Sequence, residues 1–287
     1  MAKKVILTAD STADLTPELR KRYHVEGNYP LHITYGDESR NDNVDIFADE
    51  VFARFKAEGV LPKTAAISVG EYVDYFSQYT EQGFEVVHIN LGSHLSCTHS
   101  NAKLAAEQLE GVYCIDSQNL STGTGLLVIE AAERIAKGMS AAEVAAEVNE
   151  LVSKSHASFV LDTLKFLAAG GRCSTVAALG ANLLQIKPSI EVDNKDGGAM
   201  NVGKKYRGKL DKCVLEYVRD QLARYDDIRP DRIFITHSGI SKEIVDMIRA
   251  ELESRNFFKE IIETSASCTI SSHCGPNCVG ILFMTEK

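Results

Sequence analysis

The sequence predicts an α/β protein of two domains: a parallel-sheet, Rossmann-like domain over residues 1–155 and an α+β domain over residues 156–287. Three observations lead to this assignment. The 287 residues exceed what one compact core usually contains. The first half alternates short apolar segments with amphipathic ones, which indicates parallel strands covered by helices. After residue 155 that alternation changes to a pattern typical of a hairpin.

The first predicted strand is the apolar run VILTAD at residues 5–10. Thr16 and Glu18 then mark the start of a helix through PELRKRY, because Thr is a favoured N-cap and acidic residues suit the first turn. The same order of strand and helix recurs three more times along the chain. The strands of these units are predicted at FEVVHINL (84–91), GVYCIDS (111–117) and DRIFITHSG (231–239).

The second domain is predicted from two adjacent segments. FVLDTLKFLAAGGR (159–172) indicates a short strand and then a helix that Gly170 and Gly171 terminate. KPSIEVDNKDGGAMNVGKKYR (187–207) indicates two strands joined by a turn at NKDGG.

Composition narrows the class of protein. The chain is 44% hydrophobic and 25% charged, as is usual for a soluble globular protein. A net charge of -9 argues against a nucleic-acid surface, which needs clustered Lys and Arg. We see neither a secretory signal in MAKKVILTAD nor an apolar run that could span a bilayer, so we expect a cytoplasmic location. The seven scattered cysteines fit reduced thiols better than a disulfide framework.

Polar loops follow the predicted strands of the first half. They are TADSTAD with Ser11, GSHLSCTHS with Ser93 and Ser96, and DSQNLSTGTG. Because ligands of open α/β sheets sit at the carboxyl ends of strands, these loops together predict a polar ligand-binding mouth. Taken singly, each Ser or Thr is equally well explained as a helix N-cap.

The segment SSHCGPNCVG (271–280) leaves several chemistries open. Zinc could use Cys268, His273, Cys274 and Cys278, but the spacing lacks a paired C-x2-C element, so we predict no metal. A hydrolase could pair Ser93 or Ser96 with His273, although no G-x-S-x-G elbow is present. His273 could equally be a packed histidine. No P-loop or correctly placed G-x-G-x-x-G occurs, so we expect no nucleotide cofactor.

Five stretches in this order resemble the DegV family of bacterial fatty-acid-binding proteins, and the resemblance covers nearly the whole chain. They are TADSTADL, PKTAAISVGEY, SHLSCT, DTLKFLAAGGR and SSHCGP. The resemblance implies two α/β domains that enclose one long-chain fatty acid between them, with the tail in an apolar tunnel. Ala65, Ala66, Cys97 and Asn277 depart from the residues common at these family positions.

The resemblance also implies roles for particular residues. Thr64, Ser96 and His273 match the family's carboxylate-binding positions, with Ser11, Ser93 and Ser272 as candidates for supporting contacts. Arg172 matches an arginine associated with docking to a partner kinase or with its phosphate chemistry.

The implied function is that of a non-enzymatic carrier, which presents its acid to a separate ATP-dependent fatty-acid kinase for acyl-phosphate formation. Transient contact with a membrane surface is compatible with such a carrier. Two alternatives stay open: a Ser/His hydrolase acting on a lipid or acyl ester, and a regulatory lipid-binding protein without a kinase partner.

Overall fold

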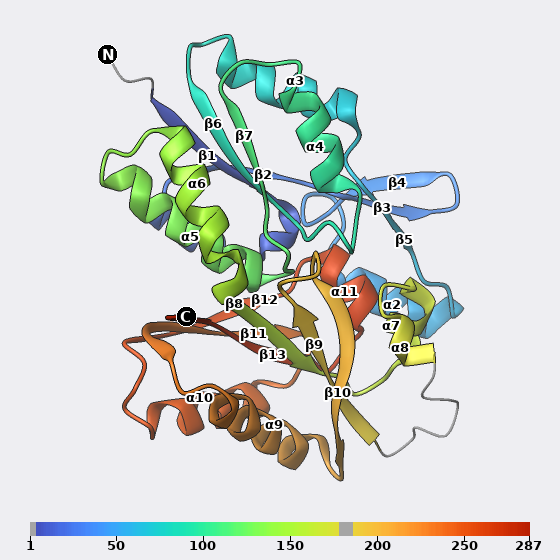
Figure 1. Ribbon diagram of the computed structural model, residues 1–287. Helices are drawn as coiled ribbons and strands as arrows, with labels where there is room; N and C mark the ends of the chain where they lie inside the picture. Colours follow the sequence, from blue (N-terminus) through green and yellow to red (C-terminus); the bar gives the residue numbers. More distant parts are fainter. Residues whose placement is uncertain (1–3, 178–185) are drawn as a thin grey trace.

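Parallel pairing joins strands of the first half into a four-stranded sheet in the computed structural model, which describes residues 4–177 and 186–287. The strand order is β2-β1-β6-β7, and every neighbouring pair is parallel. Figure 1 shows this sheet in the upper part of the molecule. The strands are β1 (Val5–Asp10), β2 (Val25–Tyr29), β6 (Glu85–Asn90) and β7 (Val112–Asp116). The predicted strand segments of this half are therefore confirmed.

Helices cover both faces of this sheet (Figure 1). On one face lie α3 (Val69–Thr80) and α4 (Thr98–Ala106); on the other lie α5 (Thr122–Ala136) and α6 (Ala141–Leu151). The short α1 (Pro17–Arg22) starts where the sequence predicts, since the Thr16 hydroxyl accepts a hydrogen bond from Leu19 N at 3.2 Å.

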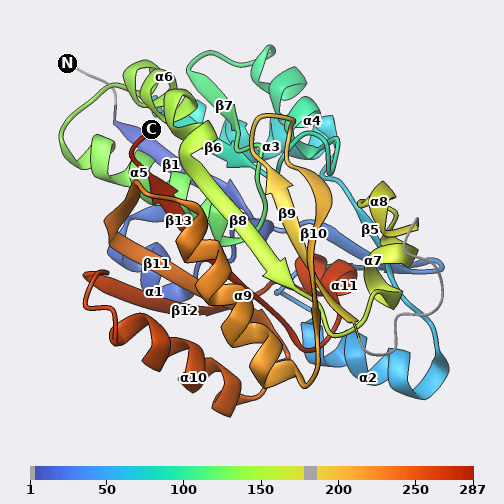
Figure 2. The same cartoon turned by 60° about the horizontal axis from the view of Figure 1, so that its bottom comes forward.

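The second main sheet has six strands in the order β10-β9-β8-β13-β11-β12. Its strands are β8 (Ser155–Val160), β9 (Ile186–Asp193), β10 (Ala199–Arg207), β11 (Ile228–Ser238), β12 (Glu260–Ser265) and β13 (Cys278–Thr285). β9 and β10 form the predicted antiparallel hairpin. β11 pairs in parallel with β12 but antiparallel with β13, so this sheet is mixed. The helices α9 (Leu210–Arg224) and α10 (Lys242–Glu253) cover its outer face (Figure 2).

Helix α5 lies between the two main sheets and contacts β1 and β6 of one and β8 and β13 of the other. All its residues from Thr122 to Ala132 are buried. A helix enclosed on all sides is expected to be apolar around its whole circumference, and most of this segment is.

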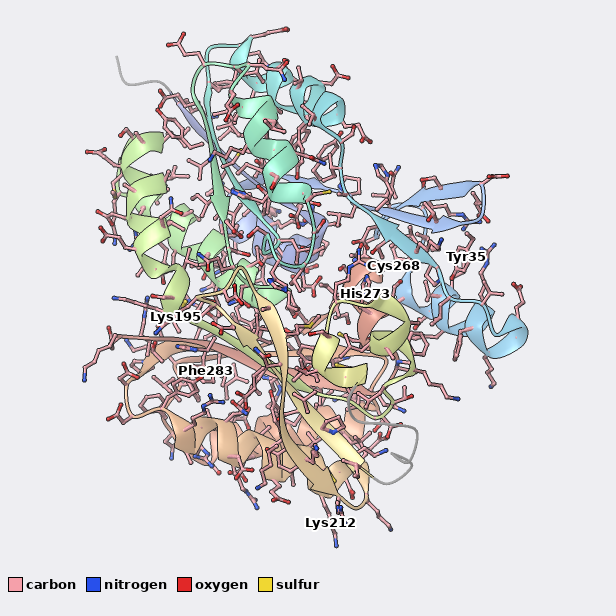
Figure 3. All side chains as sticks on the ribbon, turned by 45° about the vertical axis from the view of Figure 1, so that its right-hand side comes forward. Tyr35, Lys195, Lys212, Cys268, His273 and Phe283 are labelled. Atoms are coloured by element: carbon pink, nitrogen blue, oxygen red, sulfur yellow. The ribbon has the colours of Figure 1, made fainter. Side chains whose placement is uncertain are left out.

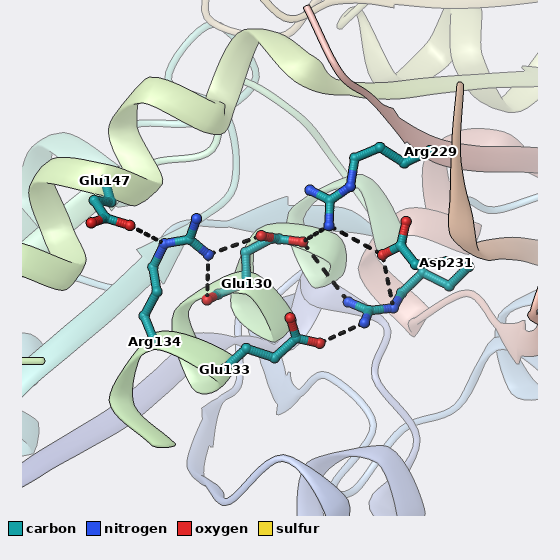
Figure 4. A network of polar contacts seen from close by, with 7 residues as sticks. Glu130, Glu133, Arg134, Glu147, Arg229 and Asp231 are labelled. Carbon is teal, nitrogen blue, oxygen red and sulfur yellow. Dashed lines mark hydrogen bonds and ion pairs between the residues drawn. The ribbon is translucent and has the colours of Figure 1, made fainter. Parts of the chain in front are cut away.

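An ion-pair network fixes the exposed end of α5 to the start of β11 (Figure 4). The Glu130 side chain is only 4% exposed; its Oε2 accepts a hydrogen bond from Arg134 at 2.9 Å, and its Oε1 forms an ion pair with Arg229 at 2.8 Å. Arg229 also pairs with Asp231, and Arg134 with Glu147. The network therefore connects α5 and α6, which cover the four-stranded sheet, to β11 of the six-stranded sheet, and most of its charged groups are shielded from water.

A small antiparallel sheet, β4-β3-β5, projects beside α2 (Ala48–Glu58). Its strands are β3 (His32–Tyr35), β4 (Glu38–Asn41) and β5 (Lys63–Ala65). The remaining short helices are α7 (Lys165–Gly170), α8 (Ser174–Ala177) and α11 (Cys268–Cys274), with single 3-10 turns at Ser11–Ala13 and Val152–Lys154. Gly171 ends α7 with φ 68°, as predicted, and its N–H donates to Leu167 O at 3.2 Å.

Helix α11 follows β12 in the chain but packs on α2, α7, β3 and β5. Its N-terminal N–H groups are bonded by side chains of the first half: Asp14 accepts from Ser267 N at 2.8 Å, and Asn43 accepts from Cys268 N at 3.1 Å. α11 is therefore positioned by residues more than 200 places earlier in the sequence.

Within residues 4–177 and 186–287, no helix combines the length and the apolar character needed to cross a bilayer.

Candidate functional site

A cavity of about 280 Å³ lies beside α11, where the loop after β6 meets β5 and α7. Polar residues from four segments line it: Thr64, Ser96, Arg172, Thr269 and His273. The larger part of the wall is apolar and is formed by Leu31, Leu91, Leu95, Leu120, Leu167, Met200 and Ile270, together with Ala65, Ala66, Cys97 and Cys274. The cavity is therefore amphipathic, with a polar cluster facing aliphatic side chains.

Thr64 and His273 form the central contact of the polar cluster. Thr64 Oγ1 lies 2.9 Å from His273 Nε2, although the two residues are 209 positions apart. Thr64 is on β5, where it pairs with Ile33 of β3, and His273 is on the last turn of α11. Figure 3 shows His273 and Cys268 on this helix, between the two main sheets. The small sheet thus brings Thr64 to the cavity.

The His273 ring is packed against a glycine. A Cβ placed on Gly170 would lie 2.9 Å from Cε1 of His273 and 3.2 Å from Cγ, so a side chain at residue 170 would displace the ring. Nδ1 of the ring is buried and has no hydrogen-bond partner among the described residues. Such an unpaired buried nitrogen is uncommon in a folded protein, and here it lies against Gly170.

The environment keeps His273 neutral. Burial, together with the positive charge of Arg172, lowers the pKa of His273 to about 4. At neutral pH the imidazole therefore carries one N–H and no charge. It can donate one hydrogen bond to a ligand without forming a full ion pair.

Ser96 lies in the same wall, at the start of α4. Its hydroxyl accepts from Thr98 N at 3.2 Å and lies 2.8 Å from Thr98 Oγ1. Ser96 is not the N-cap of α4, because Cys97 holds that position; it lies one residue earlier, forms a local bond to the start of the helix and also borders the cavity. A hydroxyl can accept from the backbone and still donate to a ligand.

Arg172 also lines the cavity, and its side chain bridges two loops. Its Nη1 donates to Gly170 O at 2.7 Å, and its Nε lies 3.4 Å from Leu95 O. Both partners are backbone carbonyls, so the positive charge is not neutralised by these bonds. The guanidinium therefore contributes a positive potential at the polar end of the cavity.

The three residues predicted as supporting contacts lie elsewhere, since the described lining of this cavity does not include Ser11, Ser93 or Ser272. Ser11 Oγ donates to Asp42 Oδ2 at 2.7 Å. Ser93 is exposed, and Ser272 Oγ donates to Cys268 O at 2.7 Å.

Sequence reasoning did not select Thr269, which lines the cavity one helical turn before His273. The signal was available, because residues four apart on a helix share a face. It could be read only once residues 268–274 were known to form a helix. Leu31 and Met200 were missed for a different reason: nothing local distinguishes a cavity leucine or methionine from a core one.

The arrangement of side chains supports neither a metal site nor the catalytic triad of a hydrolase. In the described segments, 4–177 and 186–287, no group of three His, Cys, Asp or Glu side chains could coordinate a metal ion. Burial raises the pKa of Cys268 to about 12, which disfavours the thiolate that zinc requires. His273 Nε2 lies 2.9 Å from Thr64 Oγ1, and among the residues that the structure describes no carboxylate bonds to its other nitrogen as in a catalytic triad.

Comparisons with known proteins give one consistent result. A family model described as "Uncharacterised protein, DegV family" matches residues 4–286. A DegV domain-containing protein of Clostridium perfringens is 30% identical over 289 residues, which is 99% of each chain.

Two solved structures are similar to this fold over almost the full chain. A DegV family protein of Thermus thermophilus, described for its fatty-acid binding, has a TM-score of 0.88 at 26% identity, covering 98% of this chain and 99% of that one. A hypothetical protein of Thermotoga maritima, described as revealing a fatty-acid-binding function, has a TM-score of 0.83 at 25% identity over 99% of both chains. The chain described here therefore belongs to the DegV family.

Proposed function

We propose that this protein binds one long-chain fatty acid between domains formed by residues 1–155 and 156–287, and that it presents the carboxylate to a separate ATP-dependent fatty-acid kinase in the cytoplasm. The observation that carries the proposal is the convergence of Thr64, Ser96 and His273 on one wall of a cavity whose other walls are apolar. The relatives from Thermus thermophilus and Thermotoga maritima, which are described as binding fatty acids, support the same ligand class.

The polar cluster suits a carboxylate that has to react. Thr64 and Ser96 offer hydroxyl groups, and His273 offers a neutral imidazole because its pKa is lowered to about 4. Neutral donors orient an anion more weakly than a bidentate arginine does, so the carboxylate keeps more of its nucleophilicity toward a phosphoryl donor.

Arg172 is suited to the proposed transfer of a phosphoryl group by the kinase. It is exposed, borders the cavity and has no carboxylate among its described hydrogen-bond partners. Its charge can stabilise the negative charge that accumulates when a phosphoryl group approaches the acid. The protein itself supplies no nucleotide-binding motif, so the nucleotide belongs to the partner kinase.

The apolar walls supply most of the affinity. Each buried methylene contributes about 0.8 kcal/mol, so a long acyl chain gains roughly 10 kcal/mol before entropic costs. An affinity of that size allows the acid to be taken from a membrane surface.

The test is direct identification of the bound molecule. Native mass spectrometry of the purified protein and analysis of an organic extract should both show one long-chain fatty acid per chain. Fatty acid added to delipidated protein should raise its melting temperature by mass action. If extract, intact mass and melting temperature all show no fatty acid, the binding function is wrong. If the acid binds but no kinase phosphorylates it in the complex, the protein is a lipid-binding protein of another kind.

A further inference from the structure

Two further cavities follow one another from the cavity of about 280 Å³ beside α11, here called the head-group cavity. A very small one, of about 20 Å³, shares Leu120, Ile270 and Cys274 with the cavity described above. It lies on the inner face of the six-stranded sheet, beside Phe159 and Leu282, which belong to the same apolar core cluster as Ile270 and Cys274. It therefore adjoins the apolar wall of the head-group cavity on the side of the six-stranded sheet.

A third cavity, of about 520 Å³, lies on the other side of the small one. It differs in character because it opens to solvent: Asn43, Phe47 and Asp49 on its border are exposed. The small and the third cavity share three residues, His237, Ser238 and Ala266. The backbone of these residues, with the side chains of Ser238 and Ala266, separates a buried apolar space from one that is open to solvent.

Resting on the proposed function, we propose that Ala266 and Ser238 form the end wall that meets the terminal methyl group of the fatty acid, and that this wall sets the longest chain that binds fully buried. Successive strand residues face opposite sides, and Ser238 faces the same side as Thr236, toward α5 and α11. The His237 ring lies on the other side, 3.5 Å from Glu263, and is therefore not part of the wall.

Hydrogen bonds fix the wall in place. Ser238 Oγ donates to Ser271 Oγ at 2.9 Å, and Ser271 Oγ donates to Ala266 O at 3.2 Å. Ala266 N donates to His237 O at 2.8 Å. Ser238 is 3% and Ala266 8% exposed, so neither can move outward into solvent. The polar atoms of the wall are already paired, and contact with a methyl group leaves none of them unsatisfied.

The opening to solvent behind the wall explains why chain length should be limited there. A methylene group that remains in the buried apolar space gains about fourfold in affinity. A methylene pushed past Ala266 would enter a space bordered by the exposed residues Asn43 and Phe47, would stay in contact with water and would gain little. Affinity should therefore rise with chain length up to one value and then stop rising.

The test measures affinity for saturated fatty acids of increasing length with delipidated protein, by competition against a fluorescent fatty acid. The parent should gain about fourfold for each added methylene and then reach a plateau. Ala266→Leu, which fills the wall, should move the plateau to chains shorter by roughly three carbons. Ala266→Val should move it by a smaller step in the same direction.

A matched control is available in Ala132→Leu. Ala132 is 7% exposed, close to the 8% of Ala266, but it borders a separate cavity beside Lys4 and Met139. This variant carries the same increase in side-chain volume and should keep the parent's plateau.

Three outcomes overturn the proposal. The affinity of the parent could keep rising through the longest acids tested. The Ala266→Leu variant could bind with the same plateau as the parent, or Ala132→Leu could shift the plateau as much as Ala266→Leu does. The parent series decides the question even if Ala266→Leu does not fold. Absence of any fatty-acid binding by the parent would instead refute the proposed function.

Discussion

Removal of the His273 side chain tests the head-group site most directly. His273→Ala deletes the imidazole that lies 2.9 Å from Thr64 and leaves the apolar walls in place. A hydrogen bond to a charged acceptor contributes about 1.5–3 kcal/mol, so we expect the dissociation constant of a long-chain fatty acid to rise about 10- to 150-fold. The tail contribution should persist, so binding is weakened and not abolished.

His156→Ala is the matched control for this variant. His156 Nε2 lies 3.0 Å from Thr285 Oγ1, and burial lowers its pKa to about 4, as for His273. His156 does not border the head-group cavity in its described lining. The two substitutions remove the same side chain from similar surroundings, and only His273→Ala should weaken binding.

The assay is a double-mutant cycle measured by calorimetry. One change is His273→Ala, and the other replaces the fatty acid by its methyl ester or by the corresponding alcohol. If the imidazole contacts the carboxylate, the two losses should overlap by more than about 1 kcal/mol. Strict additivity, or an equal loss of affinity in His156→Ala, would refute the head-group assignment and make His273 a packed histidine.

Three other predictions concern the partner, the fold and pH. Arg172→Ala should leave fatty-acid affinity near that of the parent but slow acyl-phosphate formation by the kinase; equal turnover would make Arg172 a structural residue. Glu130→Ala should lower the free energy of urea unfolding by about 3 kcal/mol, because Arg134 and Arg229 lose a buried partner, and a loss below about 1 kcal/mol would contradict this. Burial lowers the pKa of His273 from 6.5 to about 4, so the stability it provides is complete above pH 6.5 and should be lost as pH falls toward 4, by roughly 3 kcal/mol. Unfolding curves of His273→Ala and parent at several pH values measure that difference, and parallel pH profiles would contradict it.

The parallel sheet could be predicted because its signals are local. β1, β6 and β7 coincide with predicted apolar runs, and caps such as Thr16 and Gly171 fix where helices begin and end. The fourth strand, β2, has the sequence VEGNY, which carries no such signal, and it was not predicted. The small sheet gave no such signal. Its strand Lys63–Ala65 has three residues, two of them exposed, so no alternation of buried and exposed side chains could develop.

The residues of the site were harder to predict from the sequence than the fold was. Thr64 and His273 are 209 residues apart, and only the resemblance to a family placed them together. In the chain, α11 lies between β12 and β13 of the six-stranded sheet, but it packs on β3 and β5 of the small sheet. No physical rule applied to the sequence alone predicts that contact. The positions of Ser11 and Ser272 illustrate the same limit, because a hydroxyl near a predicted mouth can turn toward a carboxylate or a carbonyl of the protein.

The separation of Thr64 from His273 along the chain also has a consequence for synthesis. The ribosome completes β5 early, but α11 is made almost last, so a nascent chain that has folded only its first sheet has hydroxyl groups without the imidazole. If the protein binds fatty acid as proposed, contact with both groups requires the complete chain, and the fraction of chains that hold fatty acid measures the fraction in which α11 has docked.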